Sequence, residues 1–282
     1  MLIFNKQEDL KNHLKSVSDQ STTIGFVPTM GALHQGHLSL IKNSLAENKI
    51  TVVSIFVNPT QFNNAEDLEK YPRTLGKDTE KIKTVSKDVL IFAPSVDDIY
   101  QGNTVSASFN FDGLENQMEG EHRPGHFDGV GTIVKRLFEI VNPNNAYFGE
   151  KDFQQLQIVK KMVEKHNLPV NVIGCPIFRE ENGLAMSSRN ERLSAQERQD
   201  AALIYKTLKT AKEKFGTESA NEITKYVEAV FDKNPEFKLE YFQIADEDEL
   251  LAAQSKTEGK KYRAFIAVFI NNIRLIDNIS LN

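Results

Sequence analysis

Short apolar runs and helical stripes alternate along roughly the first 180 residues. Residues 22–27 form a run rich in β-branched side chains that Pro28 ends, and residues 38–45 then carry leucine and isoleucine at helical spacing. Residues 50–57 are almost uninterruptedly apolar, as in a parallel strand that is covered on both faces. This order predicts a βαβ unit within the first sixty residues.

The same alternation continues beyond this unit. Asn5 with Glu8 predicts a capped first helix, which is interpreted as scaffold. Further strands are expected over residues 89–92, 146–148 and 170–178, and further helices over residues 76–87, 130–141 and 156–163. Strands that alternate with helices indicate an α/β fold with a doubly wound, mostly parallel sheet, and such sheets bind ligands beyond the carboxyl ends of their strands.

The pattern changes after about Arg192. Two capping boxes, Ser194 with Glu197 and Ser219 with Glu222, each predict the start of a helix. Strands at residues 239–244, 262–270 and 273–279 are expected to follow them. We therefore expect two domains, residues 1–185 and a smaller α+β domain of residues 186–282, with a cleft between them as an expected place for a site.

Composition narrows the classes of partner. The chain of 282 residues has 34 Lys and Arg against 39 Asp and Glu, a net charge of −5 that offers no global attraction for nucleic acid or anionic lipid. The apolar runs are far shorter than the roughly 18 residues that span a bilayer, and the N-terminal residues do not read as a signal peptide. Cys175 is the single cysteine and has no disulfide partner in the chain, so a cytoplasmic location is expected.

The loop of residues 28–37, PTMGALHQGH, joins the first predicted strand to its helix. A helix N-terminus with a nearby glycine favours a phosphate, and His34 and His37 add donors that stabilise charge on a phosphoryl group. The alternative is that both histidines make only local hydrogen bonds. A metal site is less favoured because no nearby third and fourth ligands complete it. The loop is neither a P-loop nor a G-x-G-x-x-G motif.

Two further loops carry groups that suit a small acid or a phosphate. Asn58 and Gln61 follow the second strand and have amides that donate and accept hydrogen bonds, although an Asn-Pro pair also serves as a simple turn. Lys151 follows the strand near residue 147 and offers a point charge for a phosphate. Asp152 and Gln155 are alternatively explained by a capping box, which does not account for Lys151.

Two more segments combine glycine with polar residues. Ser187, Ser188 and Arg189 suit a phosphate clamp, although the same residues suit a hinge. The pair His122 and His126 lies in a segment that could form a mobile lid or a substrate loop, with a solvated connecting loop as the default. Four of the five segments lie at the carboxyl ends of predicted strands, and this concentration favours a shared site over separate accidents.

Taken together, five motifs resemble those of the pantoate–β-alanine ligase (pantothenate synthetase) family. They are PTMGALHQGH, SIFVNPTQF, MEGEHRPGHFDGV, AYFGEKDFQQL and GLAMSSRN, in this order over most of the first 190 residues. The resemblance implies membership of the H-x-G-H nucleotidylyltransferase superfamily, with a Rossmann-like N-terminal domain and a C-terminal lid domain. The SSR motif is similar to the K-M-S-K-S loop of related aminoacyl-tRNA synthetases.

The resemblance implies a two-step reaction. ATP and pantoate give pantoyl adenylate and pyrophosphate, and the amine of β-alanine then displaces AMP to give pantothenate. It further implies Mg²⁺ with the phosphates, with Asp78 as a candidate contact, and a homodimer. Pantoate, β-alanine and ATP are the expected partners, and neither nucleic acid nor a membrane is expected.

The resemblance also implies residue roles. His37 is implied as the proton donor, with His34, Lys151 and Arg189 completing the catalytic set. Pantoate would contact Gln61, Gln155 and Asn58, and β-alanine would contact Gln61. Phe178 replaces a small branched residue, so it is expected to act through its backbone. The implied ATP-binding residues are Met30, Gly31, Ala32, Leu33, His34, Gln35, Gly36, His37, Gly149, Glu150, Lys151, Asp152, Phe178, Met186, Ser187, Ser188 and Arg189.

Two other functions remain open at this point. One is a nucleotidylyltransferase of the same superfamily that transfers AMP or CMP to a phosphorylated alcohol. The glutamine pair and the lack of an extra arginine cluster for a substrate phosphate count against it. The other is a non-catalytic nucleotide-binding or sensor protein, and the intact set of His37, Lys151 and Arg189 counts against that.

Overall fold

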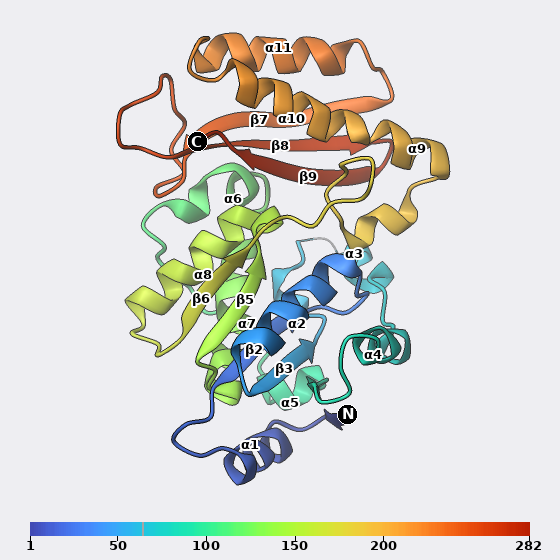
Figure 1. The fold of residues 1–282 in the computed structure, drawn as a ribbon, viewed down its shortest axis with the longest axis vertical. Coiled ribbons are helices and arrows are strands. Elements are labelled where there is room, and N and C mark those ends of the chain that lie inside the picture. The colour runs from blue at the N-terminus through green and yellow to red at the C-terminus, as the bar shows by residue number, and fades with distance from the viewer. Residues whose placement is uncertain (64) are drawn as a thin grey trace. The chain divides into compact units, whose positions relative to one another are not determined.

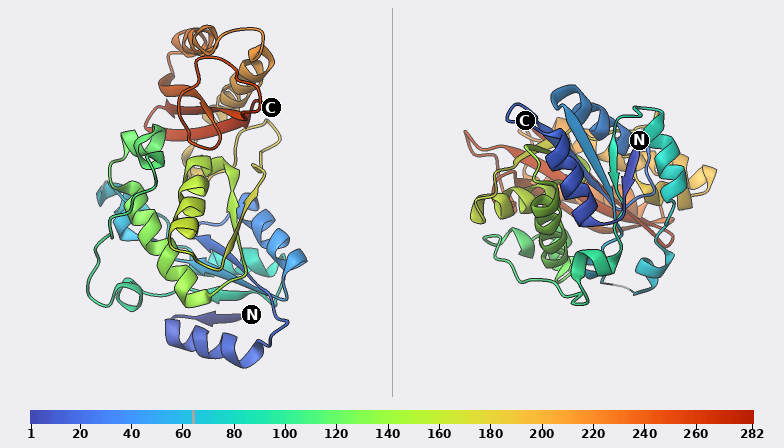
Figure 2. Two further views of the ribbon diagram at one scale, coloured as in Figure 1. Left: turned by 90° about the vertical axis from the view of Figure 1, so that its left-hand side faces the viewer. Right: turned by 90° about the horizontal axis from the view of Figure 1, so that it is seen from below.

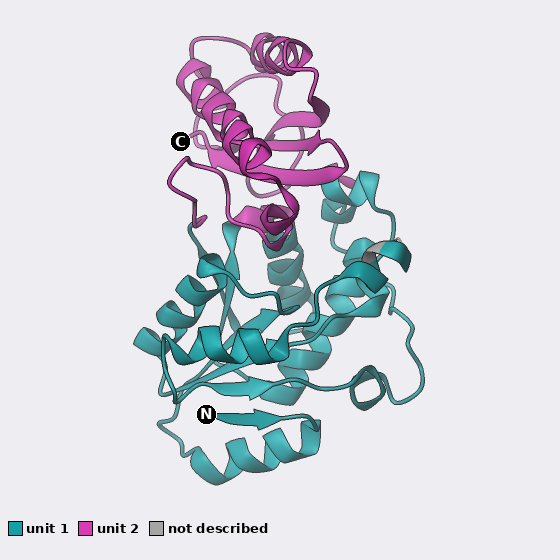
Figure 3. Ribbon diagram, turned by 90° about the vertical axis from the view of Figure 1, so that its right-hand side faces the viewer, with its two compact units in different colours: residues 1–115, 119–150, 155–176 teal, residues 116–118, 151–154, 177–282 magenta. Residues whose placement is uncertain are grey.

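The structure is a computed structural model that describes residues 1–63 and 65–282. These residues form two compact units, which Figure 3 shows in teal and magenta. The first unit contains residues 1–115, 119–150 and 155–176, and the second contains residues 116–118, 151–154 and 177–282. The domain boundary between residues 185 and 186 stays a prediction.

The first unit contains a six-stranded sheet in which all neighbouring strands are parallel. Its strands are β1 (Leu2–Phe4), β2 (Ile24–Thr29), β3 (Ile50–Ile55), β4 (Leu90–Phe92), β5 (Asn145–Gly149) and β6 (Asn171–Cys175). In the order β1-β4-β3-β2-β5-β6, the last five strands follow the Rossmann order and β1 is added at one edge. The expected Rossmann-like fold is therefore confirmed. The strand order reverses between β2 and β5, so their carboxyl ends border the crevice that binds ligands in such sheets.

Helices lie on both sides of this sheet, as the view from below in Figure 2 shows. Val27 and Tyr147 pack in one core cluster with residues of α2 and α4. The ring of Phe26 instead packs against the ring of Phe138 in α7, with their centroids 6.2 Å apart. Because neighbouring strand residues point to opposite faces, α2 and α4 cover one face and α7 covers the other. The helices up to residue 165 are α1 (Gln7–Val17), α2 (Gln35–Glu47), α3 (Ala65–Lys70), α4 (Leu75–Lys83), α5 (Val96–Tyr100), α6 (Met118–His122), α7 (His126–Val141) and α8 (Phe153–Lys165), with 3-10 turns η1 (Pro59–Gln61), η2 (Leu114–Asn116) and η3 (Glu150–Asp152).

The second unit contains an antiparallel sheet with helices packed on one face (Figure 1). Its elements are η4 (Ser188–Arg192), α9 (Ala195–Asp200), α10 (Ala202–Lys214), α11 (Ala220–Asp232), β7 (Phe237–Asp246), β8 (Tyr262–Ile270) and β9 (Ile273–Ser280). Ile204 of α10, Ile223 of α11 and Ile266 of β8 meet in its core. The capping boxes at Ser194 and Ser219 are both present, so the predicted α+β organisation is confirmed.

Two local predictions were wrong in detail, and one strand was not predicted. The strand expected over residues 170–178 ends at Cys175, because the next residue, Pro176, has no N–H for the ladder. The first helix begins at Gln7 with Lys6 as its N-cap, so Asn5 does not cap it. The short strand β1 was not predicted, since its three residues gain their structure from pairing with the distant strand β4.

Cys175 lies at the end of β6, where it is 2% exposed. Burial raises the pKa of its thiol, while Asn43 donates a hydrogen bond from Nδ2 to its Sγ at 3.3 Å. The thiol is therefore held in its protonated, weakly nucleophilic form. None of the helices that the structure describes has both the length and the apolar character to cross a membrane.

Candidate active site

The loop between β2 and α2 has an unusual backbone. Gly31 and Ala32 both have positive φ angles, of 83° and 50°. Its entrance is fixed by Thr29, whose Oγ1 donates to the Ser54 carbonyl at 2.7 Å and accepts the Gly31 N–H at 3.2 Å. Since a positive φ costs glycine little, Gly31 suits this turn, and the left-handed Ala32 requires support from its surroundings.

Asp78 of α4 supplies that support. This residue is fully buried, and its Oδ1 accepts the Leu33 N–H at 2.7 Å while its Oδ2 accepts the Ala32 N–H at 3.1 Å. Thr74 also donates to Oδ2, at 3.0 Å. The carboxylate therefore holds the loop in place through two consecutive backbone donors.

Asp78 does not fit the role of magnesium contact. Its two oxygens are engaged by the loop, and the residue has no exposed surface. Among residues 1–63 and 65–282, no group of three or more His, Cys, Asp or Glu side chains is placed to hold a metal ion. Mg²⁺ commonly keeps several waters and binds through substrate phosphates, so it does not require a dedicated cluster of protein ligands.

His34 and His37 lie together at the N-terminus of α2. His34 is the N-cap residue, and its N–H donates to Nδ1 of His37 at 3.3 Å. The two rings lie with centroids 4.0 Å apart. Because Nδ1 of His37 accepts this bond, the neutral ring carries its proton on Nε2, which makes Nε2 the donor nitrogen of this side chain. The predicted clustering of the two imidazoles is present.

Gln61 and Asn58 lie beside this loop, at the carboxyl end of β3. Gln61 donates from Nε2 to the Met30 sulfur at 3.1 Å and accepts at Oε1 from Asn58 Nδ2 at 3.2 Å. Asn58 is 1% exposed and also donates to the Gly129 carbonyl at 3.1 Å. The structure thus joins three predicted site residues, and the buried Asn58 orients the Gln61 amide.

Several residues support this pair, and sequence reasoning did not assign any of them to it. Tyr100 donates from its hydroxyl to Oδ1 of Asn58 at 2.5 Å, and burial raises the pKa of that hydroxyl. Nδ1 of His126 lies 2.9 Å from the Gln61 carbonyl, and Arg123 donates to the same oxygen at 3.4 Å. His126 is 5% exposed and begins α7, so the solvated loop expected there is wrong for this residue. For Arg123 and His126, the only signal in the sequence was their position next to glycine and proline.

Gly129 of α7 allows this close approach. A Cβ at Gly129 would lie 2.4 Å from the Thr60 carbonyl oxygen and 2.7 Å from the Gln61 Cα. Gly129→Ala is expected to lower the free energy of unfolding by about 1–3 kcal/mol, because the added methyl overpacks the contact. Because the resemblance implies that pantoate contacts Gln61, the variant is also expected to raise the KM for pantoate by displacing that side chain. Thermal unfolding and steady-state kinetics measure the two effects.

Gly76→Ala is the matched control, because a Cβ at Gly76 meets nothing within 4 Å and the residue lies in α4. This variant is expected to match or exceed the parent in stability, by up to about 1 kcal/mol. Unchanged KM values in Gly129→Ala would contradict the argument that this glycine positions Gln61.

The segment after β5 carries the next predicted residues. Gly149 ends the strand, Glu150, Lys151 and Asp152 form η3, and Gln155 lies in the first turn of α8. The Lys151 side chain is 15% exposed, and its Nζ lies 3.7 Å from Oδ1 of Asp152. Asp152 immediately precedes α8 and Gln155 is the third residue of that helix, so the capping box expected from this pair stays a prediction.

The remaining predicted residues belong to the second unit. Ser187 is the N-cap of η4 and accepts the Arg189 N–H on its Oγ at 3.2 Å, and Ser188 begins that turn. Asn190, which is 1% exposed, donates to Oε1 of Glu180 at 2.7 Å and fixes the end of the segment. Phe178 is 42% exposed and accepts the Met186 N–H on its carbonyl at 3.0 Å. The segment is therefore a braced turn.

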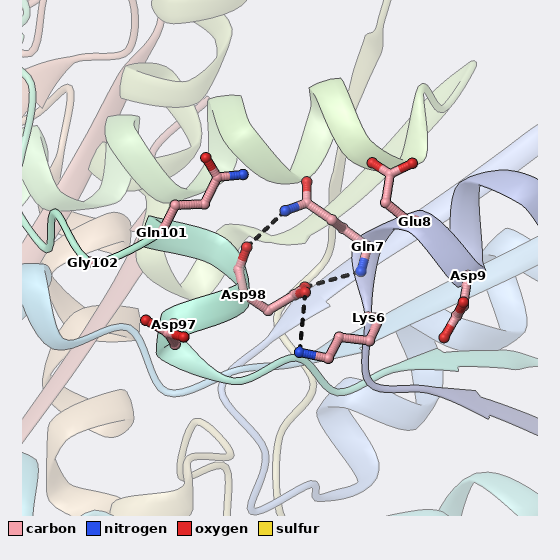
Figure 4. A pocket seen from close by; sticks show the side chains of 8 residues that line it. All are labelled: Lys6, Gln7, Glu8, Asp9, Asp97, Asp98, Gln101 and Gly102. Carbon is pink, nitrogen blue, oxygen red and sulfur yellow. Dashed lines mark hydrogen bonds and ion pairs between the residues drawn. The ribbon is translucent and has the colours of Figure 1, made fainter.

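A polar pocket elsewhere in the first unit contains none of the predicted residues (Figure 4). Gln7 donates its N–H to Oδ2 of Asp98 at 2.9 Å and its Nε2 to the Asp98 carbonyl at 2.7 Å. Nζ of Lys6 lies 3.9 Å from Oδ1 of Asp98. These contacts join the start of α1 to α5, so Lys6, Gln7 and Asp98 have a structural role in this pocket.

The family model described as Pantoate-beta-alanine ligase matches residues 2–280. The chain belongs to the pantoate–β-alanine ligase family. A pantothenate synthetase from Flavobacterium psychrophilum is 66% identical over 281 residues, which are 100% of each chain. The crystal structure of pantothenate synthetase from Thermus thermophilus has a TM-score of 0.90 and 39% identity, covering 100% of this chain and 99% of that chain. That of pantoate–β-alanine ligase from Francisella tularensis, complexed with beta-gamma ATP and beta-alanine, has a TM-score of 0.82 and 36% identity, covering 100% and 98%.

Membership of the pantoate–β-alanine ligase family confirms the expected family, the fold class and the ATP-dependent ligase activity. Both solved relatives cover the whole chain, including the second unit, for which the motifs carried little information. The roles of individual residues are a separate matter, and they remain predictions.

Proposed function

We propose that this ligase joins pantoate to β-alanine through a pantoyl adenylate held by the residues described above. In the first step a pantoate carboxylate oxygen attacks the α-phosphorus of ATP, and the bond from that phosphorus to the bridging oxygen breaks to release pyrophosphate. In the second step the β-alanine amine attacks the acyl carbon, the bond to the phosphate oxygen breaks, and the amine loses a proton as AMP leaves. No protein nucleophile is needed, so catalysis consists of positioning and charge stabilisation.

The phosphate-directed residues come from three segments. His37, with its proton on Nε2, donates to the phosphate oxygens or the leaving pyrophosphate, and His34 contacts the same group. Lys151, Ser187, Ser188 and Arg189 hold the phosphates. Met30–His37, Gly149–Asp152, Phe178 and Met186–Arg189 line ATP, with Phe178 contributing through its backbone.

Pantoate contacts Gln61 and Gln155, and Gln61 also contacts β-alanine. Asn58 contributes by holding Gln61, because it is almost fully buried and already bonded to the Gln61 amide. The Francisella tularensis relative was crystallised with a beta-gamma ATP and beta-alanine, which supports both ligands for this chain.

The observation that carries the proposal is the bond from Gln61 to Met30. It places an amide suited to a hydroxy acid against the loop that carries His34 and His37. A nucleotidylyltransferase that accepts a phosphorylated alcohol needs cations for the second phosphate, whereas the Gln61 side chain bonds a neutral amide and a thioether, and Arg123 donates to the Gln61 backbone carbonyl.

Isotope exchange between ATP and pyrophosphate tests the proposal. Exchange that depends on pantoate and proceeds without β-alanine is expected, because the adenylate forms before the amine is needed. Addition of β-alanine is then expected to release AMP and pantothenate. Exchange without pantoate would contradict the acyl adenylate, and exchange that requires a phosphorylated alcohol would indicate the nucleotidylyltransferase.

Three properties implied by the resemblance also remain proposals. They are Mg²⁺ bound with the ATP phosphates, a homodimer, and a cytoplasmic location. The buried, protonated thiol of Cys175 is compatible with a reducing compartment.

A further inference from the structure

Two consecutive polar residues, Asp277 and Asn278, are buried in the otherwise largely apolar strand β9. They are 4% and 1% exposed. Buried polar groups are costly unless they are bonded, so their partners indicate why the fold keeps them. Both lie in the second unit, as do all the residues that they contact.

Asn278 binds the backbone of Lys151. Its Nδ2 donates to the Lys151 carbonyl at 2.9 Å, and its Oδ1 accepts from Nη1 of Arg263 at 2.6 Å. Arg263 in turn donates to Oε1 of Glu247 at 3.0 Å, and its guanidinium lies 4.0 Å from the ring centroid of Phe153. The Lys151 backbone is therefore attached to a chain of buried hydrogen bonds, and the residue two positions later packs on the same arginine.

Asp277 holds the segment that leads into Ser187–Arg189, and it does so through Arg179. Arg179 donates from Nη1 to Oδ2 at 2.7 Å and from Nη2 to Oδ1 at 3.0 Å, and it also donates to the Gly183 carbonyl at 3.0 Å. Its guanidinium stacks on the Tyr205 ring at 3.6 Å. Because Arg179 pairs with Ala185 in a β-bridge, this ion pair anchors the segment that leads into Ser187–Arg189.

The two residues act on opposite faces of one sheet. In the β8–β9 register, Asp277 pairs with Ile266 and Asn278 pairs with Phe265. Ile266 belongs to the core under the helices, whereas the ring of Phe265 packs against the ring of Phe153, with their centroids 5.9 Å apart. Because side chains alternate between the two faces along a strand, Asp277 reaches Arg179 on one face and Asn278 reaches the Lys151 backbone on the other.

We propose that Asn278 is a positioning residue for Lys151 in adenylate formation, and that Asp277 plays the same part for the segment carrying Ser187 and Arg189. Strand β9 thereby sets the position of the lysine backbone relative to the serine and arginine. This inference rests on the proposed function, because it takes Lys151 as a phosphate ligand. Phosphoryl transfer depends on placement, so a displaced Lys151 costs rate even though its charge is intact.

Two variants of Asn278 separate the hydrogen bond from charge. Asn278→Asp keeps the shape and the acceptor for Arg263 but loses the donor to Lys151, and Asn278→Ala loses the donor without adding charge. Both are expected to lower kcat/KM for ATP in pantoate-dependent exchange by about tenfold, while the KM for pantoate stays within about twofold. Asn272→Asp, in the exposed turn between β8 and β9, makes the same chemical change and is expected to leave exchange unchanged.

A double-mutant cycle with Lys151→Ala tests whether Asn278 acts through Lys151. In that background Asn278→Ala is expected to change exchange by less than about twofold, because the side chain that it positions is gone. Effects that multiply would overturn the proposal, since they would make Asn278 a general structural residue. An effect confined to Asn278→Asp would also overturn it, because charge would then be the cause.

Failure of this inference is distinguishable from failure of the proposed function. If Lys151→Ala lowers exchange and neither Asn278 variant does, the positioning role is wrong and the phosphate role of Lys151 stands. If Lys151→Ala leaves exchange unchanged, the phosphate role itself is wrong. Thermal unfolding of each variant gives the folded fraction for normalisation. If Asn278→Ala does not fold, Asn278→Leu takes its place, because leucine is close to asparagine in size and carries neither the donor nor a charge.

Discussion

His37→Ala is expected to lower the rate of pantoate-dependent ATP–pyrophosphate exchange by about 10²–10⁴-fold. The reason is geometric: the His34 N–H donates to Nδ1 of His37 at 3.3 Å, which leaves Nε2 as the donor that the proposed mechanism directs at the phosphate oxygens. Alanine removes this donor from the first turn of α2. Exchange kinetics at saturating pantoate measure the loss, and the melting temperature is expected to stay near that of the parent, because His37 is only partly buried.

Two comparisons define what His37 supplies. His37→Gln keeps an N–H close to the position of Nε2, and a rate well above that of His37→Ala would identify hydrogen-bond donation as the main contribution. His166→Ala removes an exposed histidine at the end of α8 and is expected to leave the rate unchanged. A His37→Ala enzyme with the parent's exchange rate would remove this residue from the proposed chemistry.

Lys151→Ala is expected to lower exchange by roughly 10²–10³-fold, as for the loss of one preorganised group that stabilises transition-state charge. The side chain is mostly buried, so its charge acts in a medium of lower dielectric than water. Exchange is the appropriate measurement, because it reports adenylate formation without the second step. An elevated KM for ATP is expected to accompany the loss in rate.

Lys151→Arg and Lys160→Ala are the matched variants for this prediction. Arginine restores the charge with a different, planar geometry, so partial recovery is expected. Lys160 is exposed on α8, nine residues later in the chain, and its removal is expected to have no effect. Exchange by Lys151→Ala within threefold of the parent would be inconsistent with a phosphate contact.

The sequence predicted the fold well because local patterns decide most of it. The β-branched run before Pro28 and the apolar run of residues 50–57 both form strands, and the capping boxes at Ser194 and Ser219 both start helices. The failures lie where a distant partner decides, as in β1, whose residue Leu2 pairs with Leu90. Such pairings leave no short-range pattern.

The site residues also divide into those with a local signal in the sequence and those that depend on a distant partner. The loop with His34 and His37, together with Asn58 and Gln61, could be found because each follows a predicted strand. The groups that hold them could not, because Asp78 lies 45 residues beyond the Leu33 N–H that it accepts. Asp78 was one candidate for a metal contact, and it instead braces a left-handed turn. An Asp-Asn pair inside the largely apolar β9 was the one visible signal for the bracing of Lys151.

The bond between Gln61 and Met30 has a consequence for substrate entry. A thioether sulfur is a weak acceptor, whereas a carboxylate or hydroxyl oxygen is a strong one. The amide of Gln61 is aligned at its other end by Asn58 before any ligand arrives. In the proposed role of Gln61, an incoming acid would replace a weak acceptor at Nε2 and would meet a side chain whose rotational freedom has already been lost in folding.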